Sequence, residues 1–487
     1  MLNYGYLAYK KIWKQLHIEE CLKNIQDKSS IKYNLTEVTE LMAIQHLLQP
    51  RSKKATFEHL ETYYKPEEIS LQHLYRALDR LAANKEFIES FLFGENYLKV
   101  NRSVDIVFYD VTTFAFQSIN TDEIRNFGFS KDCKFHEVQT VMGLIIDADG
   151  MPIGYELFPG NTFDGKTMVH ALENIKKRFG IRKVIIVADR GLNNKDNLLQ
   201  IRNAGYGYIV ASRIKNMSSA VTEQILNAEG YIIINETFRY KILNHTNTFK
   251  DKDGVLHNLE ENLIVSYSEA RAAKDRSDRQ RLIDKAEKLL SKPEIIGAGI
   301  KRGGRQYIKS KKKQEKEYVL DTAAIEKSRR FDGYYGIQTS EKLMSAKDVT
   351  DAYHSLWRIE ESFRIMKSTL EVRPVFHWTP TRIKGHFVMC FLSLMLERKL
   401  ELLLKSDATV TDDNSPEKIR EALNLMQFAK VSVSDRTLYI KAKNNVLGNT
   451  IFKVVGLKPP KNVSSEEDLS EYSQTHVDPL WGQLSLF

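Results

Sequence analysis

Apolar and polar residues alternate with two different periodicities, one after the other, along this chain. Over residues 1 to about 100, apolar residues recur at three- and four-residue steps, as in "KKIWKQLHIEECLKNI" and "LTEVTELMAIQHLL", and this spacing predicts helices. Another helix is expected in "ISLQHLYRALDRLAANKEFIESFLF", where Ser70 is a good N-cap residue and several leucines share one stripe. Arg76 and Arg80 fall on another face of it. The region therefore fits a small DNA-binding unit or a generic helical bundle.

The second pattern, which is typical of strands, starts at about residue 103. The run "VDIVFYDVTTFAF" is β-branched and aromatic, and "EVQTVMGLIIDADGMPIGYELFPGN" predicts two strands joined at Asp149-Gly150. A helix, "DGKTMVHALENIKKRFG", in which Gly180 is placed to end it, precedes the buried strand "KVIIVADRG". The helix "NKDNLLQIRNAG" and the strand "YGYIVAS" follow. Three strands in a meander and then helix, strand, helix, strand is the order of a ribonuclease-H-like fold.

Beyond about residue 213 this regular order breaks. Strand-like pieces flank the basic segment "RAAKDRSDRQRLIDKAEKLLSK", which indicates a β-rich insertion with a long charged hairpin or helix. The fold class expected is α/β, a ribonuclease-H-like core interrupted by a β-rich insertion, with helical N-terminal and C-terminal regions. We expect the parts to be a helical DNA-binding region over residues 1–100, the core over 101–212 and 346–400, the insertion over 213–345, and a C-terminal helical region for dimerisation over 401–487.

Composition narrows the class of protein. The net charge is +9, and the segment Glu269–Glu317 alone holds 16 Lys and Arg against 8 Asp and Glu. Such a concentration of positive charge indicates a polyanionic partner or a solvated face. The three cysteines have no disulfide or zinc-ligand spacing, which favours a reducing cytoplasm. The most apolar run, Phe387 to Leu396, is about half the ~20 residues that a membrane-spanning helix needs, so we expect no membrane association.

Two aspartates stand in strands or at their ends. Asp110 lies inside "FYDVTTF", where an ionised carboxylate is costly without a cation, unless it sits at a capped edge or in a salt bridge. Asp189 ends the strand "VIIVAD", and ligands of open α/β sheets collect outside the carboxyl ends of strands. The alternative for Asp189 is the N-cap of the following helix.

A third carboxylate is expected on a helix. In "YHSLWRIEESFRIMKS", Glu360 falls with Trp357 and Phe363 on what the pattern predicts to be the inner stripe. A carboxylate that turns inward indicates a metal, and three acidic oxygen donors suit Mg²⁺ or Mn²⁺. Two such ions about 4 Å apart serve phosphodiester displacement. No His or Cys cluster predicts zinc, and His377 and His386 are expected to serve packing or phosphate contacts.

These stretches together resemble the cut-and-paste DDE transposases of bacterial insertion sequences, in the group with a Tyr-Arg-Glu-Lys signature. The resemblance covers roughly residues 100 to 400 and parts of the N-terminal region. The motifs on which it rests are "YDVTTF", "GFSKD" (Gly128 to Asp132), "FPGNTFDGKT" (Phe158 to Thr167), "VADRG" and "RPVFHWTPTRIKGH" (Arg373 to His386).

The resemblance implies a role for each matching residue. It makes Asp110, Asp189 and Glu360 the catalytic and metal-binding triad, and it makes Tyr353 and Lys367 the residues that hold the transposon-end strand. Leu356 stands where the signature has Arg, and a replacement charge is expected from Arg358 or Arg364. Arg190 is either a phosphate contact or a surface salt bridge.

The expected function is therefore metal-dependent cleavage of DNA at the ends of an insertion sequence, followed by strand transfer into target DNA. DNA is the expected partner, in a complex with a homodimer, and the expected location is the bacterial cytoplasm at the nucleoid. Two alternatives stand beside it: a catalytically silent relic that only binds DNA, with an N-terminus shorter than in relatives, and another metal-dependent nuclease of the same fold.

Overall fold

The chain is a mixed α/β protein with a large sheet and many helices, as expected from the sequence. The computed structural model describes residues 1–473 except 64–67, 129–135, 163, 182–183, 252, 292–302, 311–317, 373–374, 376, 408–413 and 434–435. It divides into two compact units. Unit 1 comprises Met1–Ile186, Ala204–Tyr206 and Ser355–Phe487, and unit 2 comprises Val187–Asn203 and Gly207–His354.

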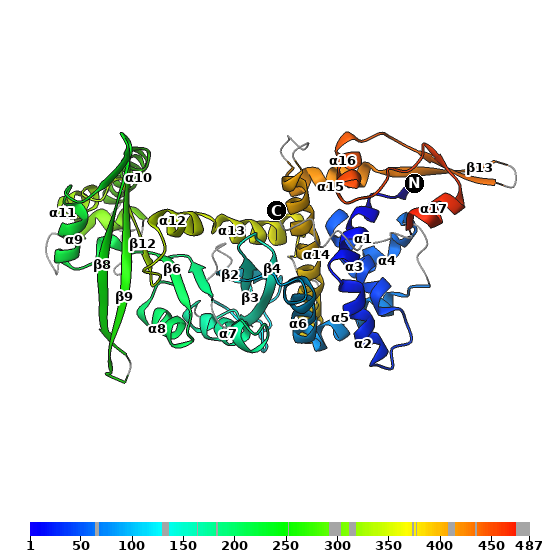
Figure 1. The fold of residues 1–487 in the computed structure, drawn as a ribbon, viewed down its shortest axis with the longest axis horizontal. Helices are drawn as coiled ribbons and strands as arrows, with labels where there is room; N and C mark the ends of the chain where they lie inside the picture. The colour runs from blue at the N-terminus through cyan, green and yellow to red at the C-terminus, as the bar shows by residue number, and fades with distance from the viewer. Residues whose placement is uncertain are drawn as a thin grey trace. The chain divides into compact units, whose positions relative to one another are not determined.

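The main sheet has the strand order β4-β3-β2-β5-β6-β12-β9-β8-β7 (Figure 1). In unit 1, β2 (Ile106–Ala115), β3 (Gln139–Asp147) and β4 (Pro152–Pro159) form the predicted antiparallel meander, in which Asp110 lies opposite Leu144. The predicted turn between β3 and β4 is confirmed: Gly150 has φ +92°, a left-handed conformation that glycine adopts without strain. The short strand β5 (Ile185–Ala188) begins in unit 1.

The N-terminal part of unit 1 is helical. Ser70 is confirmed as an N-cap: its hydroxyl accepts from the His73 backbone N–H at 3.3 Å, and the His73 ring accepts from the Ser70 N–H. The helices, with one that follows the meander, are α1 (Tyr6–Gln15), α2 (Ile18–Asp27), α3 (Leu35–Leu48), α4 (Lys53–Glu58), η1 (Leu60–Thr62), α5 (Leu71–Ala83), α6 (Lys85–Phe93), η2 (Gly94–Leu98) and α7 (Asp164–Lys177).

The long helix α14 (Pro380–Ser406) organises unit 1. It stands between the meander and the N-terminal helices in Figure 1, and it packs against α1, α3, α5 and β4. The apolar run Phe387–Leu396 is buried throughout, so it belongs to the core of this unit. The closest approach is at Gly385, where an added Cβ would lie 1.9 Å from the Leu78 carbonyl oxygen of α5. Only glycine allows the two backbones to come so near.

We expect Gly385→Ala to destabilise unit 1 by about 1–3 kcal/mol, because the new methyl group meets backbone rather than a side chain that can rotate away. Gly94→Ala is the matched control. It adds a methyl group in open space at a residue with helical φ −56°, and it should be neutral or stabilising by up to about 1 kcal/mol. Urea unfolding of both variants measures the difference, and equal stabilities would contradict the close packing of α5 on α14.

A group of buried carboxylates lies on the C-terminal half of α14. The Tyr9 hydroxyl of α1 donates to Glu397, and Arg398 donates to Glu401 at 2.5 Å. Burial, and then repulsion from Glu401, raises the pKa of Glu397 to about 8. Burial also raises the pKa of Glu401, to about 7, against the attraction of Arg398. The folded chain therefore holds protons that the unfolded chain has already released at neutral pH.

This arrangement predicts a loss of stability as the pH rises. Because the folded-state pKa of Glu397 lies above its unfolded value, its contribution is complete below about pH 4.5 and is lost as the pH passes about 8. Above pH about 6.5, where buried histidines are neutral in both states, the unfolding free energy should fall by up to about 1.4 kcal/mol per pH unit for each proton released. Glu397→Gln should flatten that slope in urea unfolding, whereas the exposed Glu421→Gln on α15 should not.

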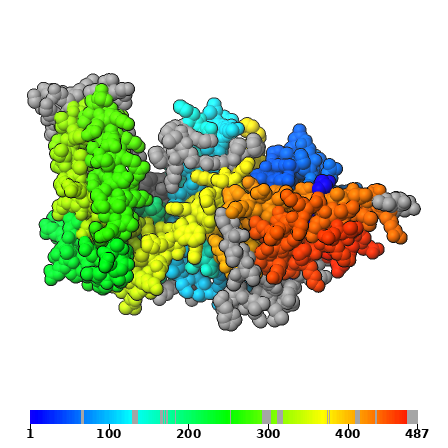
Figure 2. Space-filling model, turned by 90° about the horizontal axis from the view of Figure 1, so that it is seen from above, coloured from blue at the N-terminus to red at the C-terminus, as the bar shows by residue number. Residues whose placement is uncertain are grey.

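The C-terminal part of unit 1 corrects one expectation, since it is not helical throughout. Helices α15 (Pro416–Leu425), α16 (Val446–Val454) and α17 (Glu466–Ser473) are joined by strands, and β1 (Leu2–Asn3), β13 (Gln427–Val433), β14 (Arg436–Lys441) and β15 (Val463–Ser464) form a sheet. The stretch "QFAKVSV" alternates apolar and polar residues, which suits a strand paired with β14 better than a continued helix. Figure 2 shows the N-terminus, in dark blue, against this orange segment.

Unit 2 is rich in β-strands. Its sheet strands are β6 (Gly207–Ala211), β7 (Ile232–Asn235), β8 (Phe238–Lys250), β9 (Leu256–Ser268) and β12 (Tyr334–Thr339). The basic segment forms the 22-residue helix α10 (Glu269–Leu290). The other elements are α8 (Lys195–Asn203), η3 (Ile214–Asn216), α9 (Ser219–Leu226), η5 (Gly303–Tyr307), β10 (Ile308–Ser310), β11 (Tyr318–Leu320), α11 (Thr322–Arg329) and α12 (Ala346–His354). Among the described residues, no helix has both the length and the apolar character to cross a bilayer.

Candidate functional site

Asp110 is half-buried near the middle of β2 in unit 1, between the buried side chains of Tyr109 and Val111. The helix α13 (Trp357–Arg364), which contains Glu360, packs against β2 and β3. The two elements that bear the first and third predicted carboxylates are therefore neighbours within one unit.

Glu360 does not lie on an inner stripe, and that prediction is wrong. The buried residues of α13 are Ile359, Ser362 and Phe363, whereas Glu360 is exposed and Trp357 is 47% exposed. The physical reason is that Trp357, although aromatic, lies one turn before Glu360 on the outer face of the helix and not in the core. Among the described residues, the Glu360 carboxylate has no hydrogen bond or ion pair, and because the residue is exposed this group is available to a ligand.

The next residue, Glu361, anchors this helix. Its Oε2 lies 2.7 Å from Nη1 of Arg398 on α14, and Arg398 also donates from Nε to the Gly150 carbonyl in the β3–β4 turn at 3.3 Å. Arg398 is 1% exposed, so these contacts are shielded from water. They hold the turn of α13 that presents Glu360 in a fixed position relative to the meander. No local pattern identifies this arginine, since its partners Glu361 and Gly150 come from segments far away in the sequence.

Lys367 approaches the strand of Asp110. It lies on η6 (Ile365–Thr369), and its Nζ is 5.8 Å from the centre of the Phe114 ring on β2. Phe114 and Asp110 are four residues apart on one strand and so point to the same face of the sheet. Arg364 makes an exposed ion pair with Glu361 at 3.3 Å, and the Arg358 guanidinium lies 5.7 Å from the Trp357 ring. DNA contacts for these three cations stay predictions.

In unit 2, Asp189 follows the end of β5, as the sequence predicts. It is exposed, it accepts from the backbone N–H of Arg190, and its carbonyl accepts from the Leu192 N–H at 3.1 Å. The alternative that Asp189 caps the next helix is wrong. Asn194 stands directly before α8 instead, and its side chain accepts from the Asn197 N–H at 2.8 Å.

Tyr353 belongs to the same unit and has a partner that sequence reasoning missed. Its hydroxyl and that of Tyr335 on β12 are 2.7 Å apart, and the Arg271 guanidinium stacks 4.2 Å from the Tyr335 ring. Burial raises the pKa of Tyr335, with smaller electrostatic effects from Asp189 and Arg190. Asp189, Arg190 and Tyr353 thus share one neighbourhood. Adjacent aromatic residues in "FDGYYGIQTS" predict a strand there, but they do not predict the pairing of the two hydroxyls.

Further cations surround Arg190 in unit 2. The Arg213 guanidinium donates to the Arg190 carbonyl at 3.2 Å. Burial lowers the pKa of Lys215, and Arg279 and Arg190 lower it further, although Asp275 and Asp332 oppose this effect. Clustered guanidinium and ammonium groups beside an exposed carboxylate suit the binding of a phosphodiester. The motif Gly128–Asp132 lies outside the described residues from Phe129 onward.

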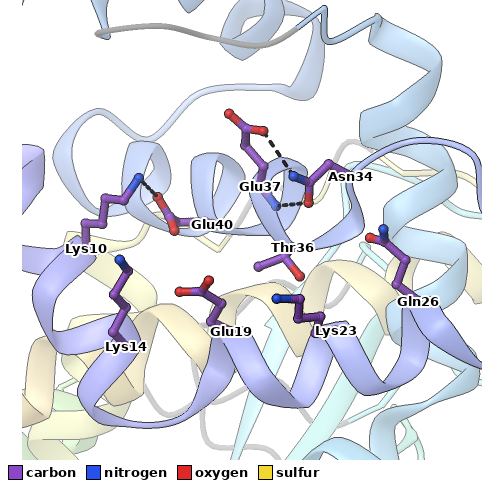
Figure 3. Close-up of a pocket in the computed structure, with 9 residues that line it drawn as sticks. All are labelled: Lys10, Lys14, Glu19, Lys23, Gln26, Asn34, Thr36, Glu37 and Glu40. Carbon is purple, nitrogen blue, oxygen red and sulfur yellow. Dashed lines mark hydrogen bonds and ion pairs between the residues drawn. The ribbon is translucent and has the colours of Figure 1, made fainter. Parts of the chain in front are cut away.

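A pocket of about 350 Å³ lies elsewhere in unit 1, among α1, α2 and α3 (Figure 3). Lysines and glutamates face one another across it, and Lys10 pairs with Glu40 at 3.3 Å. None of its lining residues belongs to the predicted site. Its mixed charge gives no preference for an anionic or a cationic ligand, so it is a weaker candidate than the carboxylates.

Comparison with known proteins gives one family. A family model described as "Transposase DDE domain" matches residues 105–396. No curated protein matches the chain. Among solved structures, the cryo-EM structure of the piggyBac transposase synaptic complex with hairpin DNA is similar at 8% sequence identity and a TM-score of 0.37, over 98% of this chain and 86% of that one.

Proposed function

Because this chain belongs to the transposase DDE domain family, we propose that it is a cut-and-paste transposase of a bacterial insertion sequence, which cleaves DNA at the ends of the element and joins them to target DNA. The observation that supports this most is the position of the three carboxylates. All of them lie inside the matched segment, on β2, directly after β5 and on α13. The Tyr-Arg-Glu-Lys signature group remains the proposed branch, with Leu356 in place of its arginine.

We propose a ribonuclease-H-like catalytic core. Its support is the strand order β4-β3-β2-β5-β6, in which a meander of three strands is followed by two more strands on its other side. Helices α7 and α8 stand in sequence before β5 and before β6. This alternation of helix and strand is the order that the sequence predicts.

The proposed triad is Asp110, Asp189 and Glu360. Within unit 1, the Ile185 N–H donates to the Asp105 carbonyl at 2.8 Å, which joins the first residue of β5 to the residue before β2. Asp110 lies further along β2, and Asp189 follows the end of β5, and both side chains offer carboxylate oxygens. These oxygen donors fit Mg²⁺ or Mn²⁺, and two such ions would supply a nucleophilic oxygen and charge stabilisation for phosphodiester cleavage.

We propose that Tyr353, Arg190, Lys367, Arg358 and Arg364 contact the DNA strand that is cut. The support is chemical: four of the five are cations, and the fifth is a tyrosine whose hydroxyl is oriented by Tyr335. Binding should therefore weaken steeply with salt, because each neutralised phosphate releases counterions. A homodimer that holds two ends is the proposed assembly.

The test is incubation of the purified chain with a labelled duplex of the element's terminal inverted repeat, with Mg²⁺ and with EDTA. The proposal expects Mg²⁺-dependent nicks at the repeat boundary, followed by joining of the 3′ end to a target plasmid. Cleavage without joining would instead indicate a different nuclease of this fold. Binding without cleavage would indicate a relic that only recognises DNA. Either outcome would overturn the proposed activity.

A further inference from the structure

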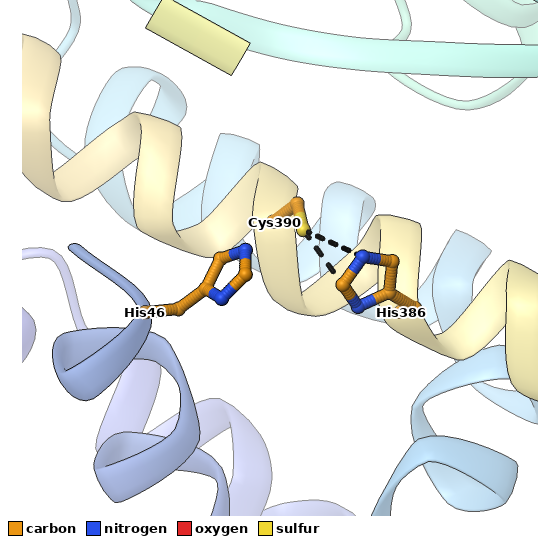
Figure 4. Close-up of side chains that lie close together, drawn as sticks. All are labelled: His46, His386 and Cys390. Carbon is orange, nitrogen blue, oxygen red and sulfur yellow. Dashed lines mark hydrogen bonds between the residues drawn. The ribbon is translucent and has the colours of Figure 1, made fainter. Parts of the chain in front are cut away.

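Two histidines and a cysteine from distant parts of the chain meet inside unit 1 (Figure 4). His386 and Cys390 lie one turn apart on α14, and His46 reaches them from α3, which packs against α14. One possible ligand atom from each lies within 4.8 Å of the other two. The Cys390 Sγ is 3.6 Å from His386 Nε2. No local spacing of His and Cys in the sequence predicts this cluster, because its members come from separate helices.

The polar atoms of this cluster are buried and incompletely satisfied. His46 is 3% exposed and His386 is 6% exposed, and Cys390 is fully buried. Neither ring nitrogen of His46 has a hydrogen-bond partner among the described residues. Leaving a buried donor or acceptor unpaired costs about 1–3 kcal/mol. The contacts of the Cys390 Sγ with the His386 ring, at 3.6 and 4.0 Å, do not supply a partner for His46, so hydrogen bonding alone does not explain the arrangement.

The protonation states of the two imidazoles favour coordination. Burial lowers the pKa of His46 and of His386 well below the usual range, so both imidazoles are neutral and have a lone pair available. Burial raises the pKa of the Cys390 thiol to about 12, which keeps it protonated when no cation is near. A bound metal ion displaces this proton to solvent and leaves a thiolate ligand.

We propose that His46, His386 and Cys390 form a structural site for a zinc-class transition-metal ion that ties α3 to α14. Thiolate and imidazole donors suit Zn²⁺, whereas Mg²⁺ requires oxygen donors, so this site is chemically distinct from the carboxylate triad. Two ligands of one tetrahedral Zn²⁺ lie about 3.5 Å apart, close to the spacing of Cys390 and His386. His377, whose ring centre is 5.2 Å from that of His386, is the candidate for a fourth ligand, and water would otherwise take that position.

Lys53 allows an independent test of this site, because its charge should affect metal binding. It is 3% exposed at the start of α4, and its charge interacts with Cys390 and with all three histidines. Burial lowers its pKa to about 8. A positively charged ammonium opposes a dication nearby, so Lys53 should weaken binding without being a ligand.

The test uses the full chain, stripped with a chelator and titrated with Zn²⁺ against a chromophoric competitor. We expect one tightly bound ion per chain and a rise in Tm with Zn²⁺ but not with Mg²⁺. Loss of a residue that merely supports a metal ligand costs about 10–100-fold in affinity, so Cys390→Ser and His46→Asn should each cost at least about 100-fold. Lys53→Met should bind more tightly than the wild type.

Co²⁺ provides a readout that a packing role would not change. The wild type should show a thiolate-to-metal charge-transfer band, Cys390→Ser should lack it, and Cys21→Ser should retain it, since Cys21 is the matched buried cysteine on α2. Absence of stoichiometric Zn²⁺ in the wild-type titration, which requires no variant to fold, overturns the proposal. Retention of the Co²⁺ band in Cys390→Ser does so as well. Both results are independent of DNA cleavage.

Discussion

Replacing Glu360 by Gln is expected to abolish Mg²⁺-dependent cleavage of the terminal-repeat duplex, with a loss of about 10²–10³-fold or more, while leaving the fold intact. The side chain is exposed and makes no ion pair or hydrogen bond among the described residues, so its removal costs little stability. Asp110→Asn should have a similar effect on cleavage, because an amide oxygen is a poorer ligand for a hard cation than a carboxylate. Single-turnover cleavage rates at saturating DNA measure both losses.

Glu361→Gln is the matched control, because it changes the adjacent carboxyl group by the same chemistry. Glu361 pairs with Arg398 and Arg364, so we expect this variant to lose stability but to keep cleavage within about tenfold when measured well below its Tm. Glu360→Gln should therefore lose cleavage and keep stability, whereas Glu361→Gln should lose stability and keep cleavage. Full cleavage by Glu360→Gln, or its loss in Glu361→Gln alone, would remove Glu360 from the proposed triad.

Replacing Arg398 by Met is expected to cost about 3–5 kcal/mol of unfolding free energy, the largest stability effect proposed for this chain. The guanidinium is buried and faces Glu361 and Glu401, so its removal takes the ion-pair partner from the buried Glu401 and leaves Glu361 with the exposed Arg364. It also leaves the Gly150 carbonyl without this donor. Chemical denaturation with urea at neutral pH measures the change.

Arg382→Met on the same helix is the control. Its guanidinium is about 42% exposed and lies 3.6 Å from Asp79, so we expect a cost of at most about 1 kcal/mol. A double variant, Arg398→Met with Glu401→Gln, should be less unstable than the sum of the single changes, because the second substitution removes one of the stranded charges. Simple additivity, or equal costs for the two arginines, would contradict the ion-pair network.

Local patterns along the sequence were sufficient for much of the fold. The order of strands and helices from β2 to β6 follows from the change of apolar period, the N-cap at Ser70 from its side-chain chemistry, and the turn at Gly150 from the freedom of glycine at positive φ. Local patterns failed where one short stretch of sequence is compatible with both a helix and a strand. The end of α15 and the start of β13 lie within one amphipathic stretch, and only pairing with β14 selects the strand.

The sequence alone determined the family resemblance and named three candidate carboxylates, because motifs and strand ends are properties of nearby residues. Only the tertiary structure decided which face of α13 turns outward, how Arg398 joins three segments, and that His46 meets His386 and Cys390. Those features depend on contacts between residues far apart in the chain. Periodicity assigns each of them to a helix or a strand, but the partner that a side chain meets is fixed only when the elements pack.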